Sequence, residues 1–335
     1  MAISEAERQL LIAAWDAKSR SPRCASEDDL RNAATELFEA DAVDIAAAFG
    51  TLVDRGWLKC DQTNGIYMLA HQGVQLAPEL LLEHRRTRFG FWMINSEKSA
   101  AYAEFCRRQY GSTLIQFNMV DSEQWATLLH ALKLERGNRV LDLGCGIGTV
   151  AEYISDHTGA HVTGIDFADQ AIRRAAERCS GKRERLAFQV GDLNCLDLAA
   201  GGFDVALAFD TLYFVDDLTK VVGDILKLLV PGGQLAAFFT SIRREGDGAS
   251  ILESRSTRLA EALTAHRCSF HTWDFTENER RLWQAASHAV DHLKSDFEAE
   301  GNMWLWKSRD KETKELMRIY KSESARRYLY HVTMG

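Results

Sequence analysis

The sequence predicts an α/β fold built on a doubly wound, mostly parallel sheet. From residue 140 onward, short apolar runs suited to buried strands alternate with longer stretches at helical spacing. The first run, residues 140–143, ends in three glycines and leads into a helical pattern that starts at Thr149. A strand, a glycine-rich turn and a helix in this order open a βαβ unit, which places ligands at the carboxyl end of the strand.

The glycine-rich turn is the first candidate binding element. Gly144, Gly146 and Gly148 lack Cβ atoms, so we expect a ligand to approach the main chain closely and to meet unpaired backbone N–H groups. The spacing G-C-G-I-G is one residue shorter than the dinucleotide fingerprint G-x-G-x-x-G. With Asp142 two residues before the first glycine, the turn resembles motif I of class I S-adenosylmethionine-dependent methyltransferases.

An acidic residue follows the next predicted strand, residues 160–165. Asp166 lies 18 residues after Gly148, the distance that a strand–helix–strand unit requires. A carboxylate at this place can accept hydrogen bonds from both ribose hydroxyls of an adenosine. Phe167, beside it, is suited to pack on the adenine face.

Two further stretches extend the resemblance. Strand 186–190 ends in Gly-Asp192-Leu193, and the resemblance implies that Asp192 meets the adenine amino group while the next backbone N–H meets a ring nitrogen. A turn at Pro231-Gly-Gly, before a strand at 235–239, is a recurrent feature of the family. The resemblance implies S-adenosylmethionine as the cofactor. The implied cofactor-binding residues are Asp142, Gly144, Cys145, Gly146, Gly148, Asp166, Phe167, Asp192, Leu193 and Phe209.

The family resemblance also implies a seven-stranded Rossmann-like sheet closed by a late antiparallel strand. Residues 270–276 and 327–333 have the pattern of the last two strands. The intervening residues, 277–324, carry amphipathic helical patterns and several aromatic side chains. We interpret them as a helical insertion that forms a substrate lid, with an oligomer interface as the alternative.

The N-terminal part predicts a separate, winged-helix-like domain. Helical patterns at 4–20, about 26–38 and 41–55 precede two short strands at 57–60 and 66–69. Residues 1–80 hold seven basic and thirteen acidic residues, a net charge of −6, which disfavours DNA binding. A dimerisation or capping role fits better, as in the N-terminal domain of small-molecule O-methyltransferases that it resembles. The predicted domains are residues 1–80, a helical connector at 81–124, and a methyltransferase domain at 125–335.

The candidate catalytic residues follow strand 203–208. Asp210 is suited to hold a cationic amine or to take a proton, and Tyr213 is suited to orient the acceptor. It is equally consistent with the sequence that Asp210 only caps the following turn.

The connector, residues 81–124, precedes the cofactor domain, where related methyltransferases place a helix that closes over the cofactor. Interdomain packing is the alternative role. The further candidate substrate residues are Tyr102, Tyr110, Gln116 and His331.

Composition narrows the function. The formal net charge is −8, which argues against a nucleic-acid surface. Seven cysteines without a C-x-x-C pair predict reduced thiols and no metal site, and the absence of a leader or long apolar run predicts a cytoplasmic protein away from membranes. We therefore expect methyl transfer to nitrogen or oxygen of a small-molecule acceptor, by a possible homodimer. The alternatives are a protein or RNA methyltransferase, and a winged-helix regulator that binds S-adenosylmethionine without catalysis.

Overall fold

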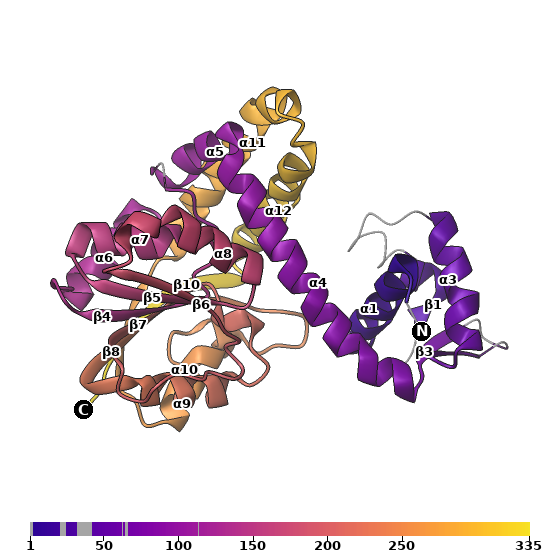
Figure 1. Ribbon diagram of the computed structural model, residues 1–335, viewed down its shortest axis with the longest axis horizontal. Coiled ribbons are helices and arrows are strands. Elements are labelled where there is room, and N and C mark those ends of the chain that lie inside the picture. Colours follow the sequence, from indigo (N-terminus) through magenta and orange to yellow (C-terminus); the bar gives the residue numbers. More distant parts are fainter. Residues whose placement is uncertain (1–2, 21–24, 32–41, 62, 64–65, 113) are drawn as a thin grey trace. The chain divides into compact units, whose positions relative to one another are not determined.

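A computed structural model describes residues 3–20, 25–31, 42–61, 63, 66–112 and 114–335. The chain divides into two compact units, Met1–Arg88 and Phe89–Gly335. Each unit has its own hydrophobic core and is considered by itself (Figure 1). Within the described residues, no helix combines the length and the apolar character that a membrane span requires.

The first unit packs helices against a small antiparallel sheet. Its elements are α1 Glu5–Arg20, β1 Ala25–Ser26, α3 Ala42–Asp54, β2 Leu58–Asp61, β3 Ile66–Leu69 and the start of α4 His71–Lys98. The strand order is β1-β3-β2, and the expected pair 57–60 and 66–69 is the antiparallel pair β2 and β3. Residues 27–31 begin the second expected helix, whose remainder lies outside the described residues. The winged-helix assignment therefore stays a prediction.

The second unit contains a seven-stranded mixed sheet with the order β6-β5-β4-β7-β8-β10-β9. Its strands are β4 Arg139–Leu143, β5 His161–Asp166, β6 Leu186–Val190, β7 Phe203–Phe209, β8 Leu229–Ile242, β9 Phe270–Asp274 and β10 Ala325–Thr333. Strands β4 to β8 run parallel, and β10 runs antiparallel to both of its neighbours. The sheet places the carboxyl ends of β4 and β7 side by side, because these two strands are paired.

Helices cover both faces of this sheet, which explains why its central strands are apolar throughout. The helices α6 Ser122–Leu132 and α7 Thr149–Thr158 cover one face, where Trp125 and Ile154 pack on β4 and β7. The helices α9 Leu218–Leu228 and α10 Arg258–Ala265 cover the other, where Val222 and Leu263 are fully buried (Figure 1). The helix α8 Asp169–Arg178 follows β5.

A helical layer lies beyond the sheet. The helices α5 Ala100–Tyr110, α11 Thr276–Ala299 and α12 Met303–Lys321 share one hydrophobic core with buried residues such as Trp283 and Phe297 (Figure 1). The helices α11 and α12 form a hairpin, in which the indole N–H of Trp306 donates to the carbonyl of Val290 at 2.9 Å. This hairpin occupies residues between β9 and β10, where the sequence predicts helices.

Candidate active site

The glycine-rich turn between β4 and α7 has the backbone shape that only glycine adopts readily. Gly144, Gly146 and Gly148 have φ values of 75°, 55° and 73°. A Cβ on Gly144 would lie 2.4 Å from Cγ2 of Thr211, and one on Gly146 would lie 2.7 Å from the sulfur of Met93. Any side chain at these positions would therefore displace the segments that close over the turn.

The backbone N–H groups of this turn are paired, contrary to the expectation that they would be free. Gly144 and Cys145 both donate to the carbonyl of Ile165, at 2.8 and 2.9 Å. Gly146 donates to Oδ2 of Asp166 at 2.9 Å. The turn is thus tied to the end of β5, and it offers close approach to the main chain rather than an anion-binding nest.

Two buried carboxylates flank the turn. Asp166 accepts from Gly146 and, through Oδ1, from the N–H of Ala168 at 2.8 Å. Asp142 is 1% exposed, and its Oδ2 has no hydrogen-bond partner among the described residues. Burial and the charge of Asp166 raise the pKa of Asp142 to about 7, and burial raises the pKa of Asp166. Both side chains retain acceptor capacity for a ligand.

The remaining expected cofactor residues have different surroundings. Phe167 meets the ring of Phe89 edge to face at 5.9 Å, and Phe89 belongs to α4. Asp192 accepts from the backbone and side chain of Asn194, at 2.9 and 3.1 Å, and stays partly exposed, as does Leu193. Phe209 is buried in the core between Trp125 and Phe238. Cys145 is buried beside Gly164, which agrees with a packing role.

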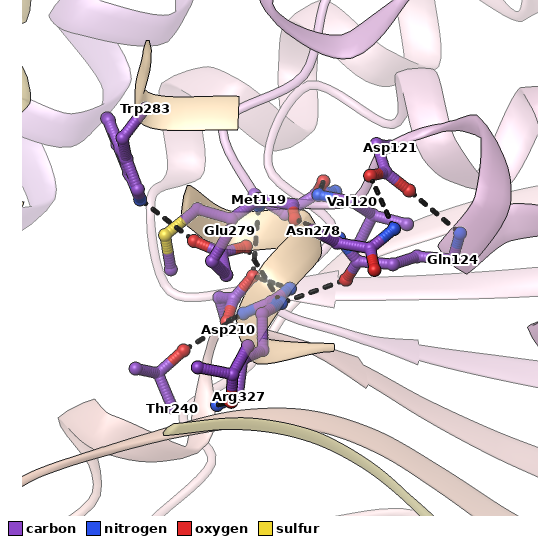
Figure 2. Close-up of polar contacts among 12 residues, drawn as sticks. Met119, Val120, Asp121, Gln124, Asp210, Thr240, Asn278, Glu279, Trp283 and Arg327 are labelled. Carbon is purple, nitrogen blue, oxygen red and sulfur yellow. Dashed lines mark hydrogen bonds and ion pairs between the residues drawn. The ribbon is translucent and has the colours of Figure 1, made fainter. Parts of the chain in front are cut away.

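Asp210 follows β7 with a left-handed backbone, φ 57°, and lies at the centre of a buried polar network (Figure 2). Its carboxylate accepts from both terminal nitrogens of Arg327, at 2.6 and 2.9 Å. It also accepts from the hydroxyl of Tyr213 at 2.9 Å and from the backbone N–H of Met119 at 3.0 Å. Four donor contacts occupy this carboxylate, so Asp210 orients the groups around it.

Arg327 connects Asp210 to α6 and α11 (Figure 2). The side chain is fully buried, and its Nε donates to Oε1 of Gln124 at 2.9 Å while lying 3.0 Å from Oε1 of Glu279. The neighbouring carboxylates of Asp210 and Glu279 raise the pKa of Arg327. The guanidinium therefore stays charged and bridges the last strand of the sheet to the helical layer.

Glu279 is a fully buried carboxylate near the start of α11. Its Oε2 accepts from the indole N–H of Trp283 at 2.8 Å. Burial raises the pKa of Glu279 to about 8, although the charge of Arg327 opposes the shift. The pKa of Tyr213 also lies well above its usual range, because the ring is buried beside Asp210. The site thus holds a carboxyl group that titrates near neutral pH.

Of the four candidate substrate residues, the structure brings Tyr102 and Gln116 into direct contact. Tyr102 is buried and donates to the carbonyl of Gln116 at 3.0 Å. The amide of Gln116 donates to Val120 at 2.7 Å, immediately before α6. Tyr110 is buried at the end of α5. His331 instead pairs with Gln234 at 2.7 Å, four residues along β10 from Arg327, or about 13 Å at the usual strand rise.

Sequence reasoning missed Arg327 and Glu279. Arg327 occurs in a stretch assigned to a strand, and Glu279 in a stretch assigned to an amphipathic helix. A charged side chain in either kind of stretch is normally exposed to solvent. The available signal was weak: an arginine within the apolar alternation of residues 325–333 occupies a position expected to be buried. A buried arginine requires a buried acidic partner, and nothing in the sequence specified which one.

Comparisons with known proteins match part of the chain to methyltransferases. Residues 140–233 match the family model described as a methyltransferase domain. A sterol 24-C-methyltransferase from Gibberella zeae is 32% identical over 161 residues, which cover 46% of this chain and 40% of that protein. A phosphoethanolamine N-methyltransferase from Zea mays is 28% identical over 231 residues, covering 62% of this chain and 46% of that protein. The chain spans less than half the length of these relatives.

Solved structures show the same fold. Phosphoethanolamine N-methyltransferase 2 from Haemonchus contortus, in complex with S-adenosyl-L-methionine, aligns with a TM-score of 0.59 at 17% identity, over 73% of this chain and 60% of that one. The α/β fold with a seven-stranded mixed sheet is thus confirmed. Residues 140–233 thus match a methyltransferase domain, which is the domain of an enzyme, and the solved structure that shares the fold holds S-adenosyl-L-methionine as the cofactor.

The residues around the turn fit this cofactor. The unpaired Oδ2 of Asp142 is buried beside the turn, where a cationic amino group would satisfy it. Asp166 uses one acceptor site on each oxygen for the backbone, and an ionised carboxylate has about four such sites, so the ribose hydroxyls can use the others. S-adenosylmethionine has no phosphate, which agrees with a turn whose N–H groups are already paired.

Proposed function

We propose that the protein transfers the methyl group of S-adenosylmethionine to a nitrogen or oxygen atom of a small-molecule acceptor. The observation that carries this proposal is the attachment of the Asp210 network to the glycine-rich turn. Thr211, next to Asp210, donates through its hydroxyl to the carbonyl of Leu143 at 3.0 Å, and its methyl group packs on Gly144. The polar network and the cofactor turn are therefore held side by side.

In this proposal the protein aligns the acceptor with the cofactor and excludes water from the site. A sulfonium cofactor brings an activated methyl group, so in-line displacement needs an acceptor held at the correct distance and angle. Asp142 and Asp166 would hold the cofactor, and Asp210 and Tyr213 would position the side chains around the acceptor. Because Asp210 is paired with Arg327, we assign it a positioning role rather than that of a free base.

Three observations favour a small acceptor over a macromolecule. The net charge is acidic, and the charged groups beside the turn are buried rather than displayed on a surface. The relatives named above act, by their names, on a sterol and on phosphoethanolamine. We further propose that α11 and α12 form a lid over the acceptor, and that the first unit mediates dimerisation.

The proposal is tested first by titrating the protein with S-adenosylhomocysteine in a calorimeter, and then by following tritium from labelled S-adenosylmethionine. Binding, followed by label in the small-molecule fraction of a metabolite extract, is the expected result. Asp210→Asn should lower transfer more than it lowers cofactor affinity. Label in protein or RNA alone would refute the small-molecule assignment, and binding without any transfer would favour a regulator.

The proposal for the first unit has its own test. Removing residues 1–70 leaves α4 intact and should change the mass measured by light scattering from that of a dimer to that of a monomer. A truncated protein with the same oligomeric state as the full chain would reject this role for the first unit.

A further inference from the structure

The last part of α4, residues 89–98, belongs to the second unit and packs on the glycine-rich turn. A Cβ on Gly146 would lie 2.7 Å from the sulfur of Met93, so this side chain touches the main chain of the turn. Met93 is buried and shares one apolar cluster with Ile147, the residue that follows Gly146. The end of α4 therefore lies at the place where the sequence predicts that a ligand approaches the turn.

The same part of α4 meets the aromatic residue that is expected beside the adenine. The ring of Phe89 lies edge to face with the ring of Phe167, 5.9 Å away, and with that of Phe214, 5.8 Å away. Phe167 comes directly after β5, and Phe214 follows β7. Through Met93 and Phe89, α4 therefore contacts two parts of the proposed cofactor site.

Ion pairs fix this part of α4 to α8 (Figure 1). The carboxylate of Glu97 accepts from Nε of Arg174 at 2.5 Å and from Nη1 of Arg178 at 3.3 Å, and its side chain is only 12% exposed. About two turns earlier, a Cβ on Gly90 would lie 3.1 Å from Cβ of Gln170 in α8, so the two helices also touch there. Because the Glu97 carboxylate is shielded from water, its ion pairs hold α4 more firmly than exposed pairs would.

Arg178 also holds the turn itself. Its Nη1 donates to the carbonyl of Ile147 at 2.7 Å, and its Nε donates to Glu152 of α7 at 3.1 Å. One planar guanidinium therefore contacts the glycine-rich turn, the helix that follows the turn and, through Glu97, the end of α4. Ile147 is fully buried, so loss of the Arg178 side chain would remove a donor from a carbonyl that water does not readily reach.

We propose that Arg178 and Glu97 are positioning residues of the cofactor site, which together keep the glycine-rich turn in shape and hold residues 89–98 of α4 against the bound cofactor. This inference rests on the proposed placement of S-adenosylmethionine at the turn, and it adds the residues that retain the cofactor there. Neither side chain needs to touch the cofactor, because Arg178 acts through the carbonyl of Ile147 and Glu97 acts through Met93 and Phe89.

The proposal has a kinetic consequence. A bound cofactor is released when the end of α4 moves away from the turn, and that movement breaks the ion pairs of Glu97 with α8. Removing these pairs should therefore raise the rate of release much more than it changes the rate of association.

The experiment measures the association and dissociation rates of S-adenosylhomocysteine on the immobilised full chain by surface plasmon resonance. Glu97→Gln keeps the shape of the side chain and removes its charge, so it should raise the dissociation rate about threefold or more. Arg178→Met removes the contact with the turn as well, and should raise that rate about tenfold or more. Association rates should stay within about twofold of the wild-type value.

Two further variants separate positioning from a general loss of structure. Arg173→Met lies on the same helix, where it loses only an exposed ion pair with Asp169, and should leave both rates unchanged. Arg178→Lys keeps the charge but loses the planar fork, so it should restore part of the slow release that Arg178→Met loses. It also replaces Arg178→Met if that variant does not fold.

Hydrogen exchange gives a second measurement that does not depend on activity. S-adenosylhomocysteine should slow the exchange of backbone amides in residues 89–98 of the wild-type chain, because it holds this part of α4 closed. The same ligand should protect these amides less in Glu97→Gln, whereas Arg173→Met should match the wild type. Equal protection in Glu97→Gln and the wild type would contradict the role of Glu97.

The rates also decide between this proposal and its alternatives. Faster association and tighter binding in Glu97→Gln and Arg178→Met would show that α4 obstructs the site, and would overturn the proposal. Unchanged rates in both variants, or equal changes in Arg173→Met, would overturn it as well. All of these outcomes leave the methyltransferase assignment standing. If the wild-type chain does not bind S-adenosylhomocysteine, the proposed function fails and this inference fails with it.

Discussion

The proposed cofactor side and the proposed acceptor side of this site are built in different ways. The proposed cofactor side comes from residues 142–148 and the end of the next strand, and the N–H groups of its turn donate to the carbonyl of Ile165 and to the carboxylate of Asp166. The acceptor side joins Asp210, Arg327 and Glu279, which belong to the end of β7, to β10 and to α11. The turn is a local motif that can be recognised in the sequence. The ion network joins residues that are far apart in the sequence and are brought together only by folding.

The largest expected effect comes from breaking the network at its only described bridging cation. Arg327→Met should lower the free energy of unfolding by about 3–5 kcal/mol, because it leaves the carboxylates of Asp210 and Glu279 buried without their partner. Urea unfolding measures the change. Arg326→Met, on the neighbouring half-buried position, is the control and should cost less than about 1 kcal/mol. Equal losses in both variants would contradict a specific role of the network.

The next effect tests the cofactor side. Asp166→Ala should weaken the binding of S-adenosylhomocysteine by about 100-fold or more, since it removes the expected ribose acceptor and leaves the N–H groups of Gly146 and Ala168 unpaired at about 1–3 kcal/mol each. Calorimetry gives the affinity. Asp169→Ala, which removes only an exposed ion pair with Arg173, should leave it unchanged. Unaltered affinity in Asp166→Ala would remove the motif assignment.

A smaller, pH-dependent effect comes from Glu279. Its folded-state pKa is raised from an ordinary value of 4.5 to about 8, so its contribution to stability is fully present below pH 4.5 and is lost as the pH rises through 8. The slope is at most about 1.4 kcal/mol per pH unit for one group. Glu279→Gln removes the titration. The difference in unfolding free energy between the two proteins should therefore fall from pH 5 to pH 8, and parallel curves would show that Glu279 does not titrate there.

The same contrast explains what the sequence could predict. The order of strands and helices followed from apolar periodicity, and all seven strands of the large sheet lie where the pattern indicated, although β8 begins six residues before the expected residue 235. Asp166 and the glycines could be located because their spacing is fixed by one strand–helix–strand unit. The hydrogen bonds from the turn N–H groups to the carbonyl of Ile165 could not be predicted from the sequence. They depend on how close the carboxyl ends of β4 and β5 lie to each other in the folded protein.

On the proposed acceptor side, the sequence singled out Asp210 and Tyr213 but not their partner Arg327. The sequence could place Asp210 and Tyr213 directly after a strand, and in the structure they are hydrogen-bonded to each other there. Their partner Arg327 lies 117 positions further along the chain, and no periodicity relates the two. Burial selects such pairs after the sheet has formed, because an unpaired charge in the interior is costly, but many acidic residues could have served a given arginine in the sequence.

The smallest expected effect lies at the opposite end of β10, and it sharpens the comparison. The sequence placed His331 near the acceptor, but the structure puts it beside Gln234, about 13 Å along the strand from Arg327. His331→Gln keeps a hydrogen-bonding side chain there, so we expect unfolding free energy to change by less than about 1 kcal/mol. Affinity for S-adenosylhomocysteine and the rate of methyl transfer should both be unchanged. A loss of methyl transfer without a loss of stability would instead place His331 in the acceptor site, and would contradict the assignment of only the Arg327 end of β10 to that site.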